Sequence, residues 1–137
     1  MTPADKQIVQ ATFAQLAPLA DQAAAMFYAR LFDMDPSLRP LFTTDLREQG
    51  KKLMQMIGVC VKGLDTLDQL VPAVRTLGQR HAGYGVTDAH YDTVGGALLW
   101  TLEMGLGEAF TPDVRAAWAA VYGVLATNMK SGARAAG

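Results

Sequence analysis

The chain of 137 residues is poor in the side chains that most often bind metals or form cross-links, with one cysteine and two histidines. The single cysteine, Cys60, cannot form an intramolecular disulfide, which is typical of proteins from a reducing cytosol. With only His81 and His90 beside it, a closed zinc site would be hard to build. We therefore expect a cytoplasmic protein whose fold depends on neither disulfides nor structural zinc.

An excess of charge of one sign is also missing. The formal net charge is −1 and the pI is about 6.0, whereas a protein that binds phosphate groups normally carries a basic surplus. Residues 1–6 lack the basic start and apolar core of a signal peptide. No apolar stretch approaches the ~20 residues that a membrane span needs. We expect no nucleic-acid partner and no membrane span.

Common catalytic motifs are missing as well. Gly50-Lys51 lacks the upstream glycine and the following hydroxyl residue of a phosphate-binding loop. No Gly-x-Ser-x-Gly sequence is present. Carboxylate pairs occur, but no spacing singles one out, and most are better interpreted as solvated helix faces. Whether the chain is an enzyme is open on this basis.

The sequence is rich in signals for helices. Three segments place a capping side chain before a proline, which is typical of a helix start, and Thr87-Asp88 is a further candidate. Apolar residues recur every three or four positions, and no alternating run with hairpin signals is found. The pattern predicts one all-α domain over residues 1–137, with about six main helices, a short helix from Pro36 and a frayed tail at 132–137. The proline starts are Thr2-Pro3, Asp35-Pro36 and Thr111-Pro112, and the glycines near expected helix ends are Gly63, Gly83, Gly85 and Gly107.

Two polar residues fall on apolar helix faces. His81 ends the stripe Val74-Leu77-His81, so its side chain is predicted to face the core, either as a satisfied core histidine or as a metal ligand. Gln49 lies four residues before Leu53 and shares its helix face. Its amide either points to water at a rim or donates to a polar ligand.

Two tyrosines offer similar alternatives. Tyr28 is either a core tyrosine whose hydroxyl reaches a carbonyl or a donor in a pocket. Tyr91 either packs in the core or hydrogen-bonds to His81. Taken together, these residues outline one histidine on one side of an apolar slot and two donors on the other. A haem iron that binds a diatomic ligand needs such a set.

The order and spacing of several segments resemble the bacterial haemoglobins related to the globin domain of flavohaemoglobins, over nearly the full length of the chain. The resemblance implies a globin fold, with helices packed around a b-type haem. The matching segments are Phe27-Tyr28-Ala29-Arg30-Leu31-Phe32, Asp35-Pro36 through Leu41-Phe42, Gln49 with Leu53, Leu77-Gly78-Gln79-Arg80-His81, Tyr91-Asp92-Thr93-Val94-Gly95 and residues 117–126.

The resemblance also implies roles for single residues. His81 is the expected proximal iron ligand and Phe42 the aromatic side chain that wedges against the haem. Tyr28 and Gln49 are the expected distal pair. The remaining expected contacts are Leu53 above the iron, Tyr91 beside the proximal histidine, Arg80 and Lys52 at the haem propionates, and Val86 and Leu98 in the cofactor pocket.

Two departures from the family pattern matter. The position of a proximal glutamate in flavohaemoglobins is Ala135 here, and the flavin and nicotinamide domains are absent. Such a carboxylate would make the imidazole more basic. Without it, His81 is expected to donate its other N–H to the Leu77 carbonyl, to Tyr91 or to both, and peroxidase-like bond cleavage is less favoured.

The resemblance favours reversible, high-affinity O2 binding in storage, scavenging or transport, by a monomer or homodimer that also binds NO and CO. The alternative is nitric oxide dioxygenation, which would need electrons from a separate reductase. A third hypothesis is a haem-free helical interaction module, and a sensor role is also open.

Overall fold

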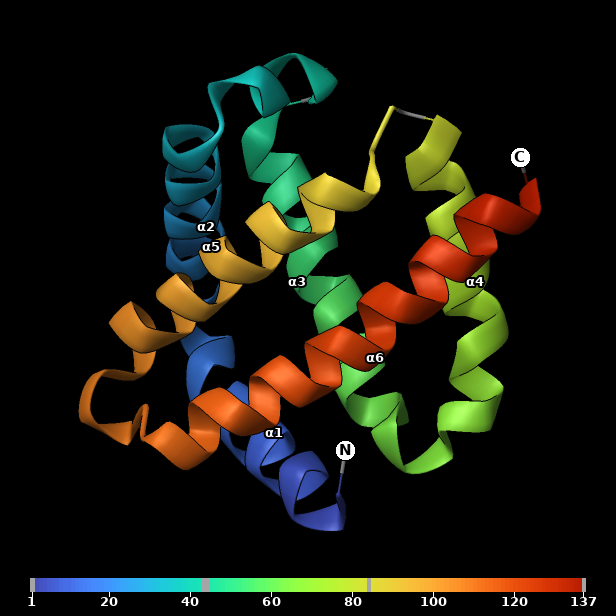
Figure 1. Cartoon of the computed structure of the whole chain (residues 1–137). Helices are drawn as coiled ribbons and strands as arrows, with labels where there is room; N and C mark the ends of the chain where they lie inside the picture. The colour runs from blue at the N-terminus through green and yellow to red at the C-terminus, as the bar shows by residue number, and fades with distance from the viewer. Residues whose placement is uncertain (1, 43–44, 84, 137) are drawn as a thin grey trace.

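The computed structural model describes residues 2–42, 45–83 and 85–136, and these ranges contain α-helices and short 3-10 helices without any strand (Figure 1). The all-α prediction and the short helix from Pro36 are confirmed. The α-helices are α1 (Pro3–Leu16), α2 (Ala20–Met34), α3 (Leu46–Lys62), α4 (Leu67–Gly83), α5 (Asp88–Leu106) and α6 (Pro112–Ala136). The 3-10 helices are η1 (Ala17–Leu19), η2 (Pro36–Leu41), η3 (Gly63–Thr66) and η4 (Gly107–Ala109).

The helix starts follow local capping chemistry. In α1, the Thr2 hydroxyl accepts from the Asp5 N–H at 3.1 Å, and the Asp5 carboxylate accepts from the Thr2 N–H at 2.9 Å. At η2, the Asp35 carboxylate accepts from the Ser37 N–H at 3.1 Å. At α5, the Thr87 N–H donates to His90 Nδ1 at 3.0 Å, so the second histidine serves as a cap.

The helices pack around two apolar clusters. One is centred on α1, α5 and α6, and the Trp118 indole N–H reaches across it to the Thr12 hydroxyl at 2.8 Å. The other joins α2, η2 and α5 around Phe27, Tyr28 and Leu31. In Figure 1, α2 and α3 lie behind α5 and α6, and the C-terminal half of α6 runs beside α4. The helix that carries His81 is therefore flanked by α6.

The end of the chain differs from expectation. The composition of residues 132–137 predicts a frayed tail, but α6 continues to Ala136. Gly132 is buried against the backbone of Arg75 in α4, so tertiary packing holds the helix at this glycine. Residues 133–136 are alanine and arginine, which are good helix formers. Residue 137 lies outside the described residues.

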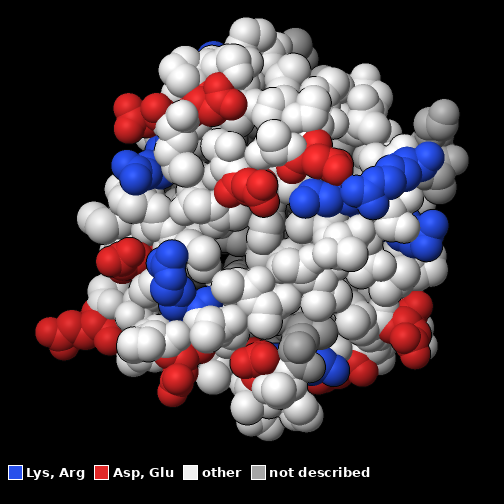
Figure 2. All heavy atoms as spheres, viewed as in Figure 1, with Lys and Arg blue, Asp and Glu red and all other residues white. Residues whose placement is uncertain are grey.

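The surface carries mixed charge. On the face shown in Figure 2, acidic and basic side chains are interspersed among uncharged ones, in keeping with the net charge of −1. Within the described ranges, no helix is both long and apolar enough to cross a membrane.

Candidate functional site

His81 lies on the last turn of α4 and is half-buried. Its Nδ1 is 2.8 Å from the Leu77 carbonyl oxygen, one helical turn earlier. The Leu77 carbonyl is one of the two partners expected for the second ring nitrogen of His81. A histidine whose Nδ1–H donates to a backbone carbonyl has its Nε2 as the metal-binding atom. The Val86 N–H donates to the His81 carbonyl at 3.1 Å, which places Val86 beside this turn.

The two expected donors come from other helices and meet each other. Tyr28 on α2 is buried, and Gln49 lies half-buried on the first turn of α3. The Tyr28 hydroxyl donates to the Gln49 backbone carbonyl oxygen at 3.4 Å. Burial raises the pKa of Tyr28 to about 12, although a hydrogen bond with the Gln49 side chain opposes the rise. The phenol therefore stays protonated at neutral pH and can donate a hydrogen bond.

Phe42 follows η2 and joins an aromatic group with these donors. Its ring centroid lies 5.4 Å from that of Tyr28 and 5.4 Å from that of Phe32, both edge to face. Such pairs contribute about 0.5–1.5 kcal/mol each beyond their buried area. The structure therefore brings Phe42 and Tyr28 together, and it holds both rings in fixed orientations.

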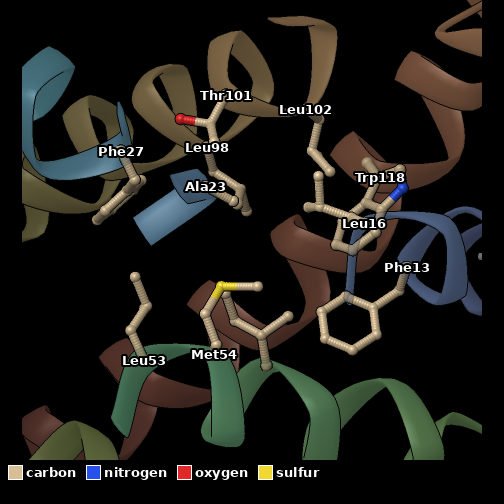
Figure 3. Close-up of a pocket in the computed structure, with 11 residues that line it drawn as sticks. Phe13, Leu16, Ala23, Phe27, Leu53, Met54, Leu98, Thr101, Leu102 and Trp118 are labelled. Carbon is tan, nitrogen blue, oxygen red and sulfur yellow. The ribbon is translucent and has the colours of Figure 1, made fainter. Parts of the chain in front are cut away.

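Leu53 and Leu98 line one small cavity (Figure 3). Leu53 and Met54 project from α3 toward Phe27, Ala23 and Leu98. The cavity has a volume of about 10 Å³, which is room for no more than one water molecule. Of its polar lining groups, the Thr101 hydroxyl already donates to the Ala97 carbonyl at 2.9 Å. The side of Leu53 that faces the core is therefore apolar and closely packed.

A larger cleft separates α3 from α4. Its volume is about 350 Å³, and it reaches Leu77 and Arg80, which lie four positions and one position before His81. Arg80 and Lys52 are both exposed, and of the two only Arg80 lines this cleft. The sequence does not predict the cleft. Its lining residues lie on two helices, and the distance between these helices is set by tertiary packing. The other lining residues are Met56, Val59, Cys60, Leu70, Ala73, Val74 and Thr76.

Tyr91 is placed differently from expectation. It is only 6% exposed, and among the described residues its hydroxyl has no hydrogen-bond partner, so the expected bond to His81 is not formed. Its backbone carbonyl accepts from the Tyr122 hydroxyl at 2.6 Å. Burial, and secondarily the charge of Asp88, raises the pKa of Tyr91. A buried hydroxyl without a partner costs about 1–3 kcal/mol, so a bound group that supplied one would be stabilised there.

These observations fit a haem. Within the described ranges, no group of three or more His, Cys, Asp or Glu side chains could hold a metal ion. A single histidine suits a haem, in which the porphyrin supplies the other in-plane ligands. The largely apolar cleft, which reaches Leu77 and Arg80 on the His81 helix but is not lined by His81 itself, suits an apolar ring with a cation at its edge. The unpartnered Tyr91 hydroxyl, which is not part of this cleft, could satisfy a polar substituent.

Comparison with known proteins identifies the family of the chain. The Globin family profile matches residues 25–129, which include Tyr28, Gln49 and His81. The neuroglobin of Tetraodon nigroviridis is 29% identical, covering 93% of this chain and 89% of its own length. The neuroglobins of Chaenocephalus aceratus and Dissostichus mawsoni are each 28% identical over the same shares. Because the family match covers most of its length, the chain belongs to the globin family, whose members bind haem and diatomic ligands.

Proposed function

We propose that the protein binds O2 reversibly and with high affinity at a b-type haem held by His81. The observation that carries the proposal is the pairing of Tyr28 with Gln49, since it places a buried, protonated hydroxyl beside a half-buried amide. These donors come from α2 and α3, whereas His81 comes from α4. When bound, haem supplies a ferrous iron that binds diatomic ligands.

The residues of this chain would hold and orient the cofactor. His81 would bind iron through Nε2, while the Leu77 carbonyl keeps the imidazole ring in one orientation. Phe42, Val86 and Leu98 would contact the ring system. Tyr91 would offer its unpartnered hydroxyl on the side of His81. The propionates would meet Arg80 and, at the surface of α3, Lys52.

Tyr28 and Gln49 would control ligand release. A ligand that draws electron density from iron becomes partly negative, and both side chains could donate hydrogen bonds to it. A hydrogen bond to a charged acceptor contributes about 1.5–3 kcal/mol. Since about 1.4 kcal/mol is tenfold in an equilibrium constant, the pair would slow O2 release by roughly two or more orders of magnitude. Slow release suits a scavenger or store better than a carrier that must unload easily.

The test is the O2 dissociation rate of Tyr28→Phe and Gln49→Ala. We expect release to accelerate about tenfold or more in Tyr28→Phe, in proportion to the lost hydrogen bond. Gln55→Ala is the matched control, because Gln55 is exposed on the same helix as Gln49. Unchanged rates in both site variants would exclude a role for the pair. An absent Soret band, together with failure to take up added haemin, would overturn haem binding itself.

Nitric oxide dioxygenation is the second candidate, because the same donors would favour it. In this reaction NO and O2 combine with one electron to give nitrate. The electron would come from a reductase, because residues 1–137 contain no flavin or nicotinamide motif of their own. Multiple-turnover NO consumption with a reductase supplied would support catalysis. A single stoichiometric burst under those conditions would contradict it.

We further propose that the chain is a cytoplasmic, single-domain haemoglobin of bacterial type, related to the globin domain of flavohaemoglobins. Support comes from the Tyr28–Gln49 pair and from Tyr91 in family order. The neuroglobin relatives support only the broader family. Spectra of the ferric protein across pH would show whether water, hydroxide or a protein group is the sixth ligand. Light scattering would decide between monomer and homodimer.

A further inference from the structure

Two glycines allow α4 and α6 to touch backbone to backbone. Gly78 and Gly132 are both buried. A Cβ atom on Gly78 would collide with the Met129 carbonyl, and one on Gly132 would collide with the Arg75 carbonyl. The contact is reciprocal. Met129 lies three positions before Gly132, and Arg75 lies three positions before Gly78. We call this reciprocal contact the glycine seam, and it lies where α4 and the C-terminal half of α6 run side by side (Figure 1).

The glycine seam lies beside the His81 turn. The Leu77 carbonyl, which holds His81 Nδ1 at 2.8 Å, belongs to the same planar peptide group as the Gly78 N–H. Any displacement of Gly78 away from α6 would therefore tilt the carbonyl that orients the imidazole. No side chain intervenes between the two backbones at this point, so there is no flexible group to absorb a displacement.

The side of α4 that faces α3 offers less support. There the cleft of about 350 Å³ separates α4 from α3 beside Leu77. The position of the His81 turn must then be set largely from the α6 side. Close backbone contact through glycines suits this task, because Cα–H groups can approach carbonyl oxygens at van der Waals distance.

We propose that the glycine seam positions α4, and through the Leu77–Gly78 peptide the His81 ring, before any cofactor binds. Gly78 and Gly132 are then positioning residues for the iron ligand. The importance of this for ligand binding rests on the proposed role of His81. The docking of α4 on α6 does not depend on that role, so it can be tested in the haem-free protein.

The first experiment is amide hydrogen exchange of the wild-type, haem-free chain. Amides at 75–81 in α4 and at 127–133 in α6 are expected to share one opening reaction, with protection factors within about tenfold of each other. Exchange of the α4 amides about a hundredfold faster than the α6 amides would overturn the proposal, because α4 would then open independently. This measurement needs no substitution and is independent of whether haem binds.

The second experiment uses Gly78→Ala and Gly132→Ala, with Gly123→Ala as the control. Gly123 is an exposed α6 glycine at which a Cβ atom would meet nothing within 4 Å. Resonance Raman spectra of the ferrous, ligand-free protein report the iron–histidine stretching band. We expect the band to shift in both seam variants and to stay in place in Gly123→Ala.

Two results separate this proposal from a purely structural role. A lower melting temperature with an unshifted iron–histidine band in both seam variants would contradict positioning of His81. If neither seam variant folds, the wild-type exchange pattern still decides whether α4 docks on α6 without haem. Failure of the wild type to bind haem would remove the proposed function but leave the exchange result interpretable.

Discussion

Burial of the Tyr91 hydroxyl carries a cost in free energy. It is buried without a partner among the described residues. We predict that Tyr91→Phe stabilises the haem-free protein by about 1 kcal/mol, because an unsatisfied buried hydroxyl is removed. Urea unfolding followed by circular dichroism would measure the change.

Tyr122→Phe is the matched control for this prediction. Its hydroxyl donates to the Tyr91 carbonyl at 2.6 Å, so its loss should destabilise the protein by about 0.5–1.5 kcal/mol. Equal destabilisation by both changes would show that the Tyr91 hydroxyl is already satisfied in solution.

The Tyr28 phenol makes stability depend on alkaline pH. Burial raises its pKa from 10.0 to about 12, so between these pH values the unfolded chain loses a proton that the folded chain keeps. The stabilisation is therefore complete below pH 10 and is lost as the pH rises toward 12, by about 2–3 kcal/mol. Unfolding free energies of the haem-free wild type and Tyr28→Phe from pH 8 to pH 12 would test this. Parallel curves for the two proteins would refute it.

Local geometry decides which site residues can be predicted. The His81–Leu77 hydrogen bond joins positions four apart on one helix, so it could be foreseen as one alternative. The Tyr91 hydroxyl could not be placed, because its surroundings depend on the tertiary distance between α4 and α5. The Tyr28–Gln49 contact joins two helices. The order of the family motifs predicts the two partners, but it does not predict the distance between them.

Among the helices, α1 and α6 are joined by a buried hydrogen bond. The Trp118 indole N–H donates to the Thr12 hydroxyl at 2.8 Å, and both side chains are buried. We predict that Thr12→Val destabilises the protein by about 1–3 kcal/mol, because the indole N–H loses its partner. Thr12→Ser retains the hydroxyl and should lose clearly less. Urea unfolding followed by Trp fluorescence would compare them, and equal losses would contradict the hydrogen-bond explanation.

Helix starts were predictable and one helix end was not. Thr2, Asp35 and Thr87 form caps with residues two or three positions away, so the necessary information is local. The α6 terminus depends on burial of Gly132 against α4, and the small side chains of this segment give no sign of that contact. The sequence gives no sign of the α3–α4 cleft either, because the cleft depends on how two separate helices pack.

In the whole molecule, stability depends on completely buried leucines. Leu102 is 0% exposed and lines the small cavity beside Leu98, whereas Leu19 is 44% exposed. We predict that Leu102→Ala lowers the free energy of unfolding by about 2–5 kcal/mol, and that Leu19→Ala changes it by less than about 0.5 kcal/mol. Thermal unfolding of both variants would measure this. A loss for Leu102→Ala as small as that for Leu19→Ala would show that the apolar cluster is not closely packed there.

The glycine seam also has a consequence for the order of events during synthesis. Gly132 is made only after all of α5 and most of α6, yet it docks on the turn that precedes His81. On a chain emerging from the ribosome, α4 therefore remains without this contact until almost all of α6 is available. Contacts between residues distant in sequence form late, because the intervening chain must first be ordered. Capture of a cofactor by His81 should accordingly follow the synthesis of Gly132 rather than precede it.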